Sequence, residues 1–157
     1  MKQCKMGSYT KIYIQAVYAV KYRKALIAKE WRSELMGVLG NLINETGCKT
    51  IIVNGVADHV HCFFSLKSTL TVAEVMRKTK SKSSKWINDQ GLCEERFAWQ
   101  GGYGAFSYSS SAVENVYNYV KNQEQHHQRQ AFLKEYKTLL KKYDIPYEDK
   151  YIFDLPI

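Results

Sequence analysis

The sequence lacks the features that mark membrane, secreted and disulfide-linked proteins. No stretch approaches the ~18 consecutive apolar residues that a membrane span needs. The segment Met1 to Tyr9 has no apolar core of the kind found in signal peptides. The four cysteines, at positions 4, 48, 62 and 93, form no C-x-x-C pair, so neither a zinc knuckle nor a disulfide framework is expected. We expect a cytoplasmic protein with free thiols and no membrane partner.

Internal repeats and low-complexity linkers are also absent, which favours one domain over 1–157. A chain of 157 residues can bury about two thirds of its unfolded surface without disulfides or metals. The expected divisions are a sandwich core over 8–110, two helices over 111–143 and a tail over 144–157. The formal net charge of +8 favours a polyanionic partner such as a nucleic acid, although charge alone names no function.

Hydrophobic periodicity predicts the order of strands and helices. Alternating apolar residues are typical of strands, and apolar residues three and four apart are typical of helices. The expected strands are Ser8 to Lys21, two short strands within Ile51 to Leu66, and one within Phe97 to Tyr108. The expected helices are Leu26 to Thr46, one that follows Thr71, Ser111 to about His127, and Ala131 to Lys142. This order predicts a ferredoxin-like (RRM-like) α+β sandwich with a central antiparallel sheet and a C-terminal helical extension.

Two helix starts carry a specific local pattern. Thr71 and Ser111 are each followed three residues later by a glutamate, Glu74 and Glu114. In such a capping box, each of the two side chains binds the backbone N–H of the other residue. We therefore expect a helix to begin at both places.

The stretch His59-Val60-His61 is the most informative part of the sequence. Side chains two apart on a strand project from the same face, so the two imidazoles would both point outward and could share one metal ion. The opposite face would point to the core, with Val60, Cys62 and Phe64. The alternative is an ordinary pair of surface histidines. Alternation aims Asp58 away from His59, so we interpret Asp58 as a turn residue or as support for a ligand.

The helix that is expected from Ser111 carries one tyrosine outside its apolar stripe. The stripe consists of Val113, Val116, Tyr117 and Val120. Tyr119 lies off this stripe, and Gln123 follows one turn later on the same face. A phenol and a carboxamide could therefore approach one site together, or Tyr119 could be an ordinary surface residue.

These residues resemble the single-tyrosine HUH transposases of small bacterial insertion sequences, REP-associated tyrosine transposases included. The resemblance extends from about Tyr9 to Gln123, and a similarity to longer members continues to about Tyr151. It is carried by the first strand with Lys21-Tyr22-Arg23, by Asp58-His59-Val60-His61, by the lysine-rich helix, by Gly102-Tyr103-Gly104-Ala105-Phe106-Ser107 and by Tyr119-Val120-Lys121-Asn122-Gln123. A histidine pair followed by a tyrosine helix is specific, whereas either part alone is weak.

The resemblance implies a metal-dependent transposase that nicks and rejoins single-stranded DNA and recognises subterminal hairpins. Tyr119 would be the nucleophile of a 5′-phosphotyrosine intermediate. His59, His61 and Gln123 would hold a divalent metal, Mg2+ or Mn2+. This chemistry is consistent, because a phenol with a pKa near 10 needs a strongly polarised electrophile.

The resemblance also implies a homodimer whose active sites are completed in trans, with Tyr119 of one subunit at the histidines of the other. Glycine allows backbone angles that other residues avoid, so the three glycines that precede the tyrosine helix could act as its hinge: Gly101, Gly102 and Gly104. The other interpretation is that these glycines accommodate a bulged strand and that the helix packs in cis.

Several alternatives stay open. Tyr117 is a second candidate nucleophile, although it belongs to the expected apolar stripe. His126 and His127 could join the histidine pair in a zinc site. The chain could also be a non-catalytic protein that binds single-stranded or hairpin nucleic acid. The joint presence of two histidines, Tyr119 and Gln123 favours catalysis, because a binding protein does not need them all.

Basic residues supply candidate DNA contacts. Lys78, Lys82 and Lys85 would share one face of the helix after Thr71, and Lys21 and Arg23 form a second patch. A solvated lysine face is the usual meaning of such a pattern. The positive net charge and the expected nuclease site favour contacts with phosphates instead.

Overall fold

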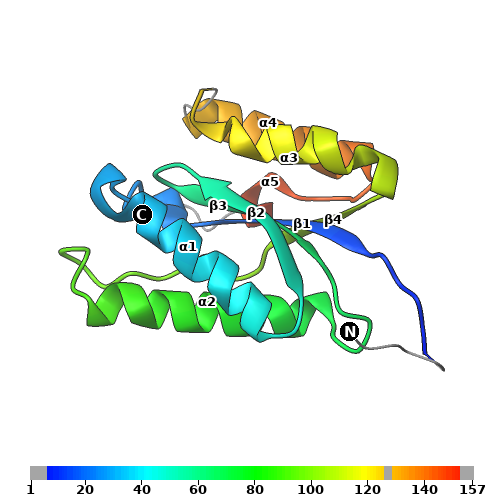
Figure 1. The fold of residues 1–157 in the computed structure, drawn as a ribbon. Helices are drawn as coiled ribbons and strands as arrows, with labels where there is room; N and C mark the ends of the chain where they lie inside the picture. The colour runs from blue at the N-terminus through cyan, green and yellow to red at the C-terminus, as the bar shows by residue number, and fades with distance from the viewer. Residues whose placement is uncertain (1–6, 126–128, 153–157) are drawn as a thin grey trace.

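The computed structural model describes residues 7–125 and 129–152, and its centre is a four-stranded antiparallel sheet (Figure 1). The strands are β1 (Tyr13–Ala19), β2 (Lys49–Gly55), β3 (His59–Ser65) and β4 (Gly104–Tyr108), in the spatial order β2-β3-β1-β4. The helices are α1 (Lys29–Glu45), α2 (Val72–Asp89), α3 (Val113–Lys121), α4 (Arg129–Lys142) and α5 (Asp149–Ile152). This is the α+β sandwich that the sequence predicts, with α3 and α4 as the helical extension.

One face of the sheet packs against α1 and α2 (Figure 1). The three residues of β3 that the sequence assigns to the core, Val60, Cys62 and Phe64, are buried on this side, together with the alternate residues Ile14, Ala16 and Tyr18 of β1. The helices add the buried side chains Trp31, Leu35, Leu39, Ile43, Val75, Met76 and Ile87. Period-2 alternation therefore predicts which face of each strand carries this core.

The opposite face is divided between α3 and α4. α3 packs Val116 and Val120 on Phe63 of β3. α4 packs Phe132 against the other half of the sheet, where Phe106 of β4 is buried. Both faces of the sheet are therefore covered, and polar residues on this side of β1 and β3 are enclosed as well.

α4 fits the sheet closely at one glycine. A methyl group at Gly104 would lie 2.6 Å from both Cε1 and the hydroxyl oxygen of Tyr136, closer than real Cβ atoms approach their neighbours. The Tyr136 ring packs on Phe106 and Phe132, and burial raises the pKa of Tyr136 to about 12. Full burial of a side chain such as Phe132 contributes about 1.5–3 kcal/mol. α4 is therefore a structural part of the sandwich.

The two predicted capping boxes have different outcomes. At the start of α2, Thr71 Oγ1 accepts from the Glu74 N–H and the Glu74 carboxylate accepts from the Thr71 N–H, each at 3.1 Å. The Glu74 carboxylate accepts from both the N–H and the hydroxyl of Thr71, and these two hydrogen bonds lower the pKa of Glu74. At the start of α3 the predicted box is wrong, because no side chain caps the helix after Ala112. The hydroxyl of Ser111 lies instead 2.9 Å from the hydroxyl of Ser109.

The observed elements are shorter than predicted at several ends. β1 begins at Tyr13 rather than Ser8, because Tyr13 pairs with the last residues of β3 and β4. α3 ends at Lys121, before the His127 that the sequence suggests. Within 7–125 and 129–152, no helix is both long and apolar enough to cross a membrane.

Candidate active site

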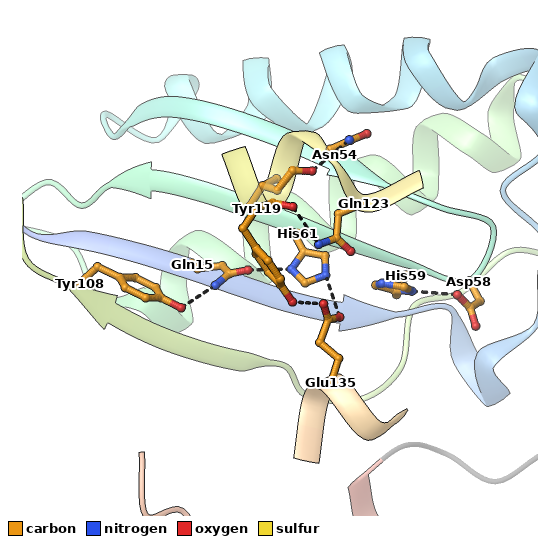
Figure 2. Close-up of polar contacts among 10 residues, drawn as sticks. Gln15, Asn54, Asp58, His59, His61, Tyr108, Tyr119, Gln123 and Glu135 are labelled. Atoms are coloured by element: carbon orange, nitrogen blue, oxygen red, sulfur yellow. Dashed lines mark hydrogen bonds and ion pairs between the residues drawn. The ribbon is translucent and has the colours of Figure 1, made fainter. Parts of the chain in front are cut away.

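His59 and His61 lie on the face of β3 that α3 and α4 cover (Figure 2). They share a face as predicted, but both are 0% exposed, so the expectation that they face outward was wrong. The two histidines are buried because α3 and α4 cover them. Phe132 of α4 stacks on His59 with ring centroids 3.4 Å apart, and Tyr119 of α3 meets the His61 ring edge-on at 5.8 Å.

Each imidazole is oriented through its Nδ1 atom. Asp58 Oδ1 lies 2.8 Å from His59 Nδ1, and Gln15 Oε1 lies 2.7 Å from His61 Nδ1. These oxygens accept hydrogen bonds, so the ring protons stay on Nδ1 and each Nε2 lone pair is available to a metal. Asp58 therefore orients a candidate ligand, which agrees with one of the roles that the sequence suggests for it.

The orientation of the Gln15 carboxamide is fixed by a second hydrogen bond. Gln15 Nε2 donates to the Tyr108 hydroxyl at 2.8 Å, so the amide oxygen is the atom that meets His61. Burial raises the pKa of Tyr108 above its ordinary value, which keeps the phenol neutral. A chain of contacts from β4 through β1 thus sets the tautomer of His61 on β3.

A glutamate from α4 joins the two histidines. Glu135 Oε2 accepts a hydrogen bond from the Tyr119 hydroxyl, and Glu135 Oε1 lies 3.6 Å from His61 Nε2. The ligand atoms of His59, His61 and Glu135 all lie within 4.8 Å of one another. Imidazole nitrogens and a carboxylate oxygen are common ligands of divalent ions. The residues present therefore fit the divalent metal that the sequence resemblance implies.

Gln123 lies beside this cluster. It begins the 3-10 turn Gln123–Gln125 after α3, is 2% exposed, and donates from Nε2 to the Tyr119 carbonyl at 3.2 Å. Figure 2 shows its carboxamide near both histidines. Asn54 of β2 donates to the carbonyls of Val120 and Lys121, each at 3.0 Å, and so holds the end of α3 over the site.

The other candidate site residues from the sequence lie away from the cluster of His59, His61 and Glu135, or outside the residues that the structure describes. Tyr117 is 38% exposed, so its assignment to the apolar stripe was wrong. The buried side of α3 is narrow, because only Val116 and Val120 of this helix are buried. His126 and His127 lie outside the described residues.

A groove of about 550 Å3 between α3 and α4 gives access to the nucleophile candidate. Tyr119 and Glu135 line it together with Lys134 and Lys142. Tyr119 is 38% exposed even though its hydroxyl is hydrogen-bonded. A phosphate backbone that lies in this groove would meet positive charge next to the phenol.

α2, which carries the predicted lysine face, lies on the other side of the sheet from α3, which carries Tyr119 (Figure 1). Lys82 Nζ is 3.9 Å from a carboxylate oxygen of Glu45, and Lys85 Nζ is 2.6 Å from one of Asp89. Such exposed ion pairs contribute little to stability and compete weakly with phosphate. This face is therefore available to DNA, but at a distance from the nucleophile candidate.

The second basic patch lies at the histidine end of the sheet. Lys21 and Arg23 are the first and last residues of a 3-10 turn, which follows β1 directly after Val20. Ala19, the last residue of β1, pairs with His59. Arg23 has a φ of 54°, an angle that few residues other than glycine adopt. A DNA strand that contacts this turn would be close to the two histidines.

Two residues of the site, Gln15 and Glu135, are not among those predicted from the sequence. Gln15 is a polar residue on a strand face that is otherwise apolar, which was the available signal. Glu135 is the single acidic residue between Arg129 and Lys142 and lies three residues after the buried Phe132. Its position next to an apolar stripe was the only sign that it faces the sheet.

Known proteins share this fold and sequence pattern. The family profile described as "Transposase IS200 like" matches residues 8–123. A solved structure of a candidate transposase from Deinococcus radiodurans superposes with a TM-score of 0.62 at 18% identity, covering 78% of this chain and 98% of that chain. A REP-associated tyrosine transposase bound to a REP hairpin superposes with a TM-score of 0.53 at 12% identity, covering 78% and 72%.

At these identities the two structures show a common fold alone, and no curated protein matches the sequence. The family profile covers most of the chain, including both histidines, Tyr119 and Gln123. This match confirms the resemblance that the motifs suggest. The protein belongs to the IS200-like transposase family.

Proposed function

We propose that this transposase cleaves and rejoins single-stranded DNA with Tyr119 as the nucleophile. The proposal rests mainly on one observation: the Tyr119 hydroxyl is hydrogen-bonded to a carboxylate that also adjoins His61 Nε2. The phenol is thereby oriented next to the two imidazoles. The groove between α3 and α4 offers space for a strand of DNA at the same place.

In the proposed step, Tyr119 Oη attacks a phosphorus atom and forms the Oη–P bond while the bond from phosphorus to the 3′ oxygen breaks. The phenol proton passes to Glu135 Oε2, which already accepts its hydrogen bond. The leaving 3′ oxygen takes a proton from solvent and becomes a 3′-hydroxyl. The protein then carries a 5′-phosphotyrosine. Because one phosphoester replaces another, rejoining needs no nucleoside triphosphate.

His59, His61 and Gln123 are proposed to hold a divalent ion, Mg2+ or Mn2+. When bound, such an ion supplies positive charge that polarises the phosphate and stabilises the charge of in-line displacement. The hydrogen bonds that His59 Nδ1 donates to Asp58 and His61 Nδ1 donates to Gln15 support this role, because they place the ring proton on Nδ1 and leave Nε2 as the metal-binding atom. Phe132 covers the face of His59 and excludes water from it.

The proposed substrate is DNA with a subterminal hairpin. One structural relative is bound to a REP hairpin, which supports the same class of partner here. Lys78, Lys82 and Lys85 of α2 are proposed to contact the hairpin, and α2 lies on the opposite side of the sheet from α3, the helix that carries Tyr119 (Figure 1). Lys21 and Arg23 are proposed to contact the strand that approaches the histidines. Recognition and cleavage would then use different sides of the protein.

A homodimer with active sites completed in trans stays a proposal drawn from the family resemblance. Tyr119 lies beside His61 of the same chain. An exchange of α3 and α4 between two copies would form the same contacts across subunits, as in other domain-swapped dimers. Cis and trans assembly therefore predict the same site and differ only in which chain supplies the tyrosine.

The proposed function is tested by incubating the protein with Mn2+ and hairpin-bearing single-stranded DNA from the flanks of its own gene. Denaturing gels should show a covalent protein–DNA band for wild type. Tyr117→Phe is the matched control, because Tyr117 lies two residues away and is 38% exposed, as is Tyr119. The band should persist in Tyr117→Phe and vanish in Tyr119→Phe. A band that persists in Tyr119→Phe would exclude Tyr119 as the nucleophile.

A further inference from the structure

We propose that Glu135 of α4 binds the same divalent ion as His59 and His61. The inference rests on the proposed function and extends it, because Glu135 lies outside residues 8–123 that the family profile matches. The ligand set inferred from the sequence has two imidazoles and a carboxamide, all of them neutral. Glu135 adds the one charged oxygen to the set.

The two oxygens of Glu135 have different neighbours. Oε1 lies 3.6 Å from His61 Nε2, and Oε2 accepts the hydrogen bond of Tyr119. Donor atoms that bind one ion at about 2.1 Å lie about 3.0–3.5 Å from each other. The three donors here lie within 4.8 Å of one another, so a contraction of at most about 1.3–1.8 Å would bring them to bonding distance.

The position of Glu135 is set by the packing of α4 and not by a mobile side chain alone. Phe132, one turn before it, is 1% exposed and stacks on His59. Tyr136, the next residue, is 5% exposed and fills the space left by the missing side chain of Gly104. α4 is anchored on both sides of Glu135, by Phe132 before it and by Tyr136 after it. A helix that covered the site only to block it would have to detach easily, and these contacts oppose detachment.

The charge of Glu135 has a chemical consequence. Carboxylate oxygens are the ligands that Mg2+ and Mn2+ prefer, whereas an all-imidazole site also suits Zn2+ or Ni2+. One carboxylate that binds the ion through Oε1 and the phenol through Oε2 would also hold the nucleophile at a fixed distance from the metal. α4 therefore couples metal binding to the placement of Tyr119.

The test is calorimetric titration of Mn2+ into protein freed of metal with a chelator. Glu135→Gln keeps the shape of the side chain and removes its charge. Loss of a group that merely supports a ligand lowers metal affinity about 10–100-fold, so loss of a ligand should lower it at least ~100-fold. Glu114→Gln, an exposed glutamate on α3, is the matched control and should bind Mn2+ like wild type. The double variant His59→Ala, His61→Ala should bind none.

Thermal unfolding with and without Mn2+ gives a second measurement that does not depend on catalysis. Bound Mn2+ should raise the Tm of wild type and of Glu114→Gln, and it should leave Glu135→Gln nearly unchanged. If Glu135→Gln fails to fold, Glu135→Asp keeps the charge on a shorter side chain and should show intermediate affinity.

If wild type and Glu135→Gln bind Mn2+ equally well and the double histidine variant does not bind it, Glu135 is not a ligand, whereas the role of the two histidines stands. Absence of Mn2+ binding in wild type would refute the inference together with the proposed metal site. The covalent band of Tyr119 tests the nucleophile separately, so failure of this inference can be told from failure of the proposed function.

Discussion

Replacing Gly104 by alanine tests whether α4 is a fixed wall of the active site. The new Cβ atom would lie 2.6 Å from Cε1 and from the hydroxyl oxygen of Tyr136. An ordinary carbon contact is about 3.5 Å or more, so the ring must move by about 1 Å. Tyr136 cannot turn aside freely, because its ring is rigid and packs between Phe106 and Phe132.

Overpacking of this kind costs about 1–3 kcal/mol. For a chain of this size, each kcal/mol lowers the Tm by about 2–4 °C, so we expect a loss of about 2–12 °C. Gly101→Ala is the matched control, because nothing lies within 4 Å of a Cβ atom at Gly101. It should unfold within about 0.5 kcal/mol of wild type. The measurement is thermal or urea unfolding followed by circular dichroism.

A second substitution shows whether Tyr136 is the cause. Tyr136→Leu alone removes buried ring atoms and should destabilise the protein. In the Gly104→Ala background the smaller leucine makes room for the methyl group, so the double variant should lose at least about 0.5 kcal/mol less than the sum of the single losses. Equal stability of Gly104→Ala and Gly101→Ala, or strict additivity with Tyr136→Leu, would refute the close docking of α4 on β4.

Two further predictions concern metal and DNA. Gln15→Leu removes the acceptor at His61 Nδ1 and should lower Mn2+ affinity about 10–100-fold, measured by calorimetry. Thr79→Val changes a buried polar residue of α2, which packs on the other face of the sheet, and should leave the Mn2+ affinity unchanged. Equal Mn2+ affinity in Gln15→Leu and in wild type would show that Gln15 does not orient His61. Neutralising the α2 lysines Lys78, Lys82 and Lys85 with glutamine should reduce the slope of log affinity against log salt by about 0.7 for each lost phosphate contact on single strands. Replacing Lys29, Lys49 and Lys67 with glutamine is the control, because it removes the same charge elsewhere. If both triple variants show the same slope of log affinity against log salt, the α2 lysines face solvent and do not contact phosphates.

Local patterns predict much of this fold because neighbouring residues determine them. Alternation in β3 assigns Val60, Cys62 and Phe64 to the core, and the structure buries all three beneath α1 and α2. The capping box at Thr71 marks the start of α2 because its hydrogen bonds join residues three apart. The same pattern at Ser111 fails, since a nearby hydroxyl offers its side chain another partner.

The burial of the histidines and the presence of Glu135 could not be predicted in the same way. Both depend on where α4 docks, and the contact between Glu135 and His61 joins residues on different elements. The motifs that carry the family resemblance end at Gln123, so they give no weight to a glutamate that follows them. The one indication in the sequence is a single acidic residue three positions after Phe132. This indication is weak, because helices often carry an acidic residue at the edge of an apolar stripe.

The predicted glycine hinge does not fit the observed order of elements. Gly101, Gly102 and Gly104 all come before or at the start of β4, and β4 pairs with β1 from Val17↔Gly104 to Tyr13↔Tyr108. A swing about these glycines would break that pairing. The segment that connects β4 to α3 is instead Ser109 to Ala112. An exchange between subunits that begins there would carry α3 and α4 together.

Subunit mixing therefore distinguishes trans from cis assembly and also tests which helices move. One subunit carries Tyr119→Phe, and its partner carries His59→Ala and His61→Ala. Trans assembly predicts recovered cleavage, with the covalent DNA on the subunit that keeps Tyr119. Cleavage that stays absent in verified heterodimers would mean that the sites form in cis.

Glu135 sharpens this experiment, because it sits on the helix that would travel with Tyr119. If α3 and α4 exchange as a unit, Glu135→Gln should reduce the recovered cleavage when it is added to the subunit with the histidine substitutions. The same change in the Tyr119→Phe subunit should leave the recovered cleavage unaffected, since the Glu135 of that subunit belongs to the inactive site. The opposite result would mean that α3 exchanges while α4 stays on its own sheet. That outcome would require the contact between Tyr119 and Glu135 to form across the two chains.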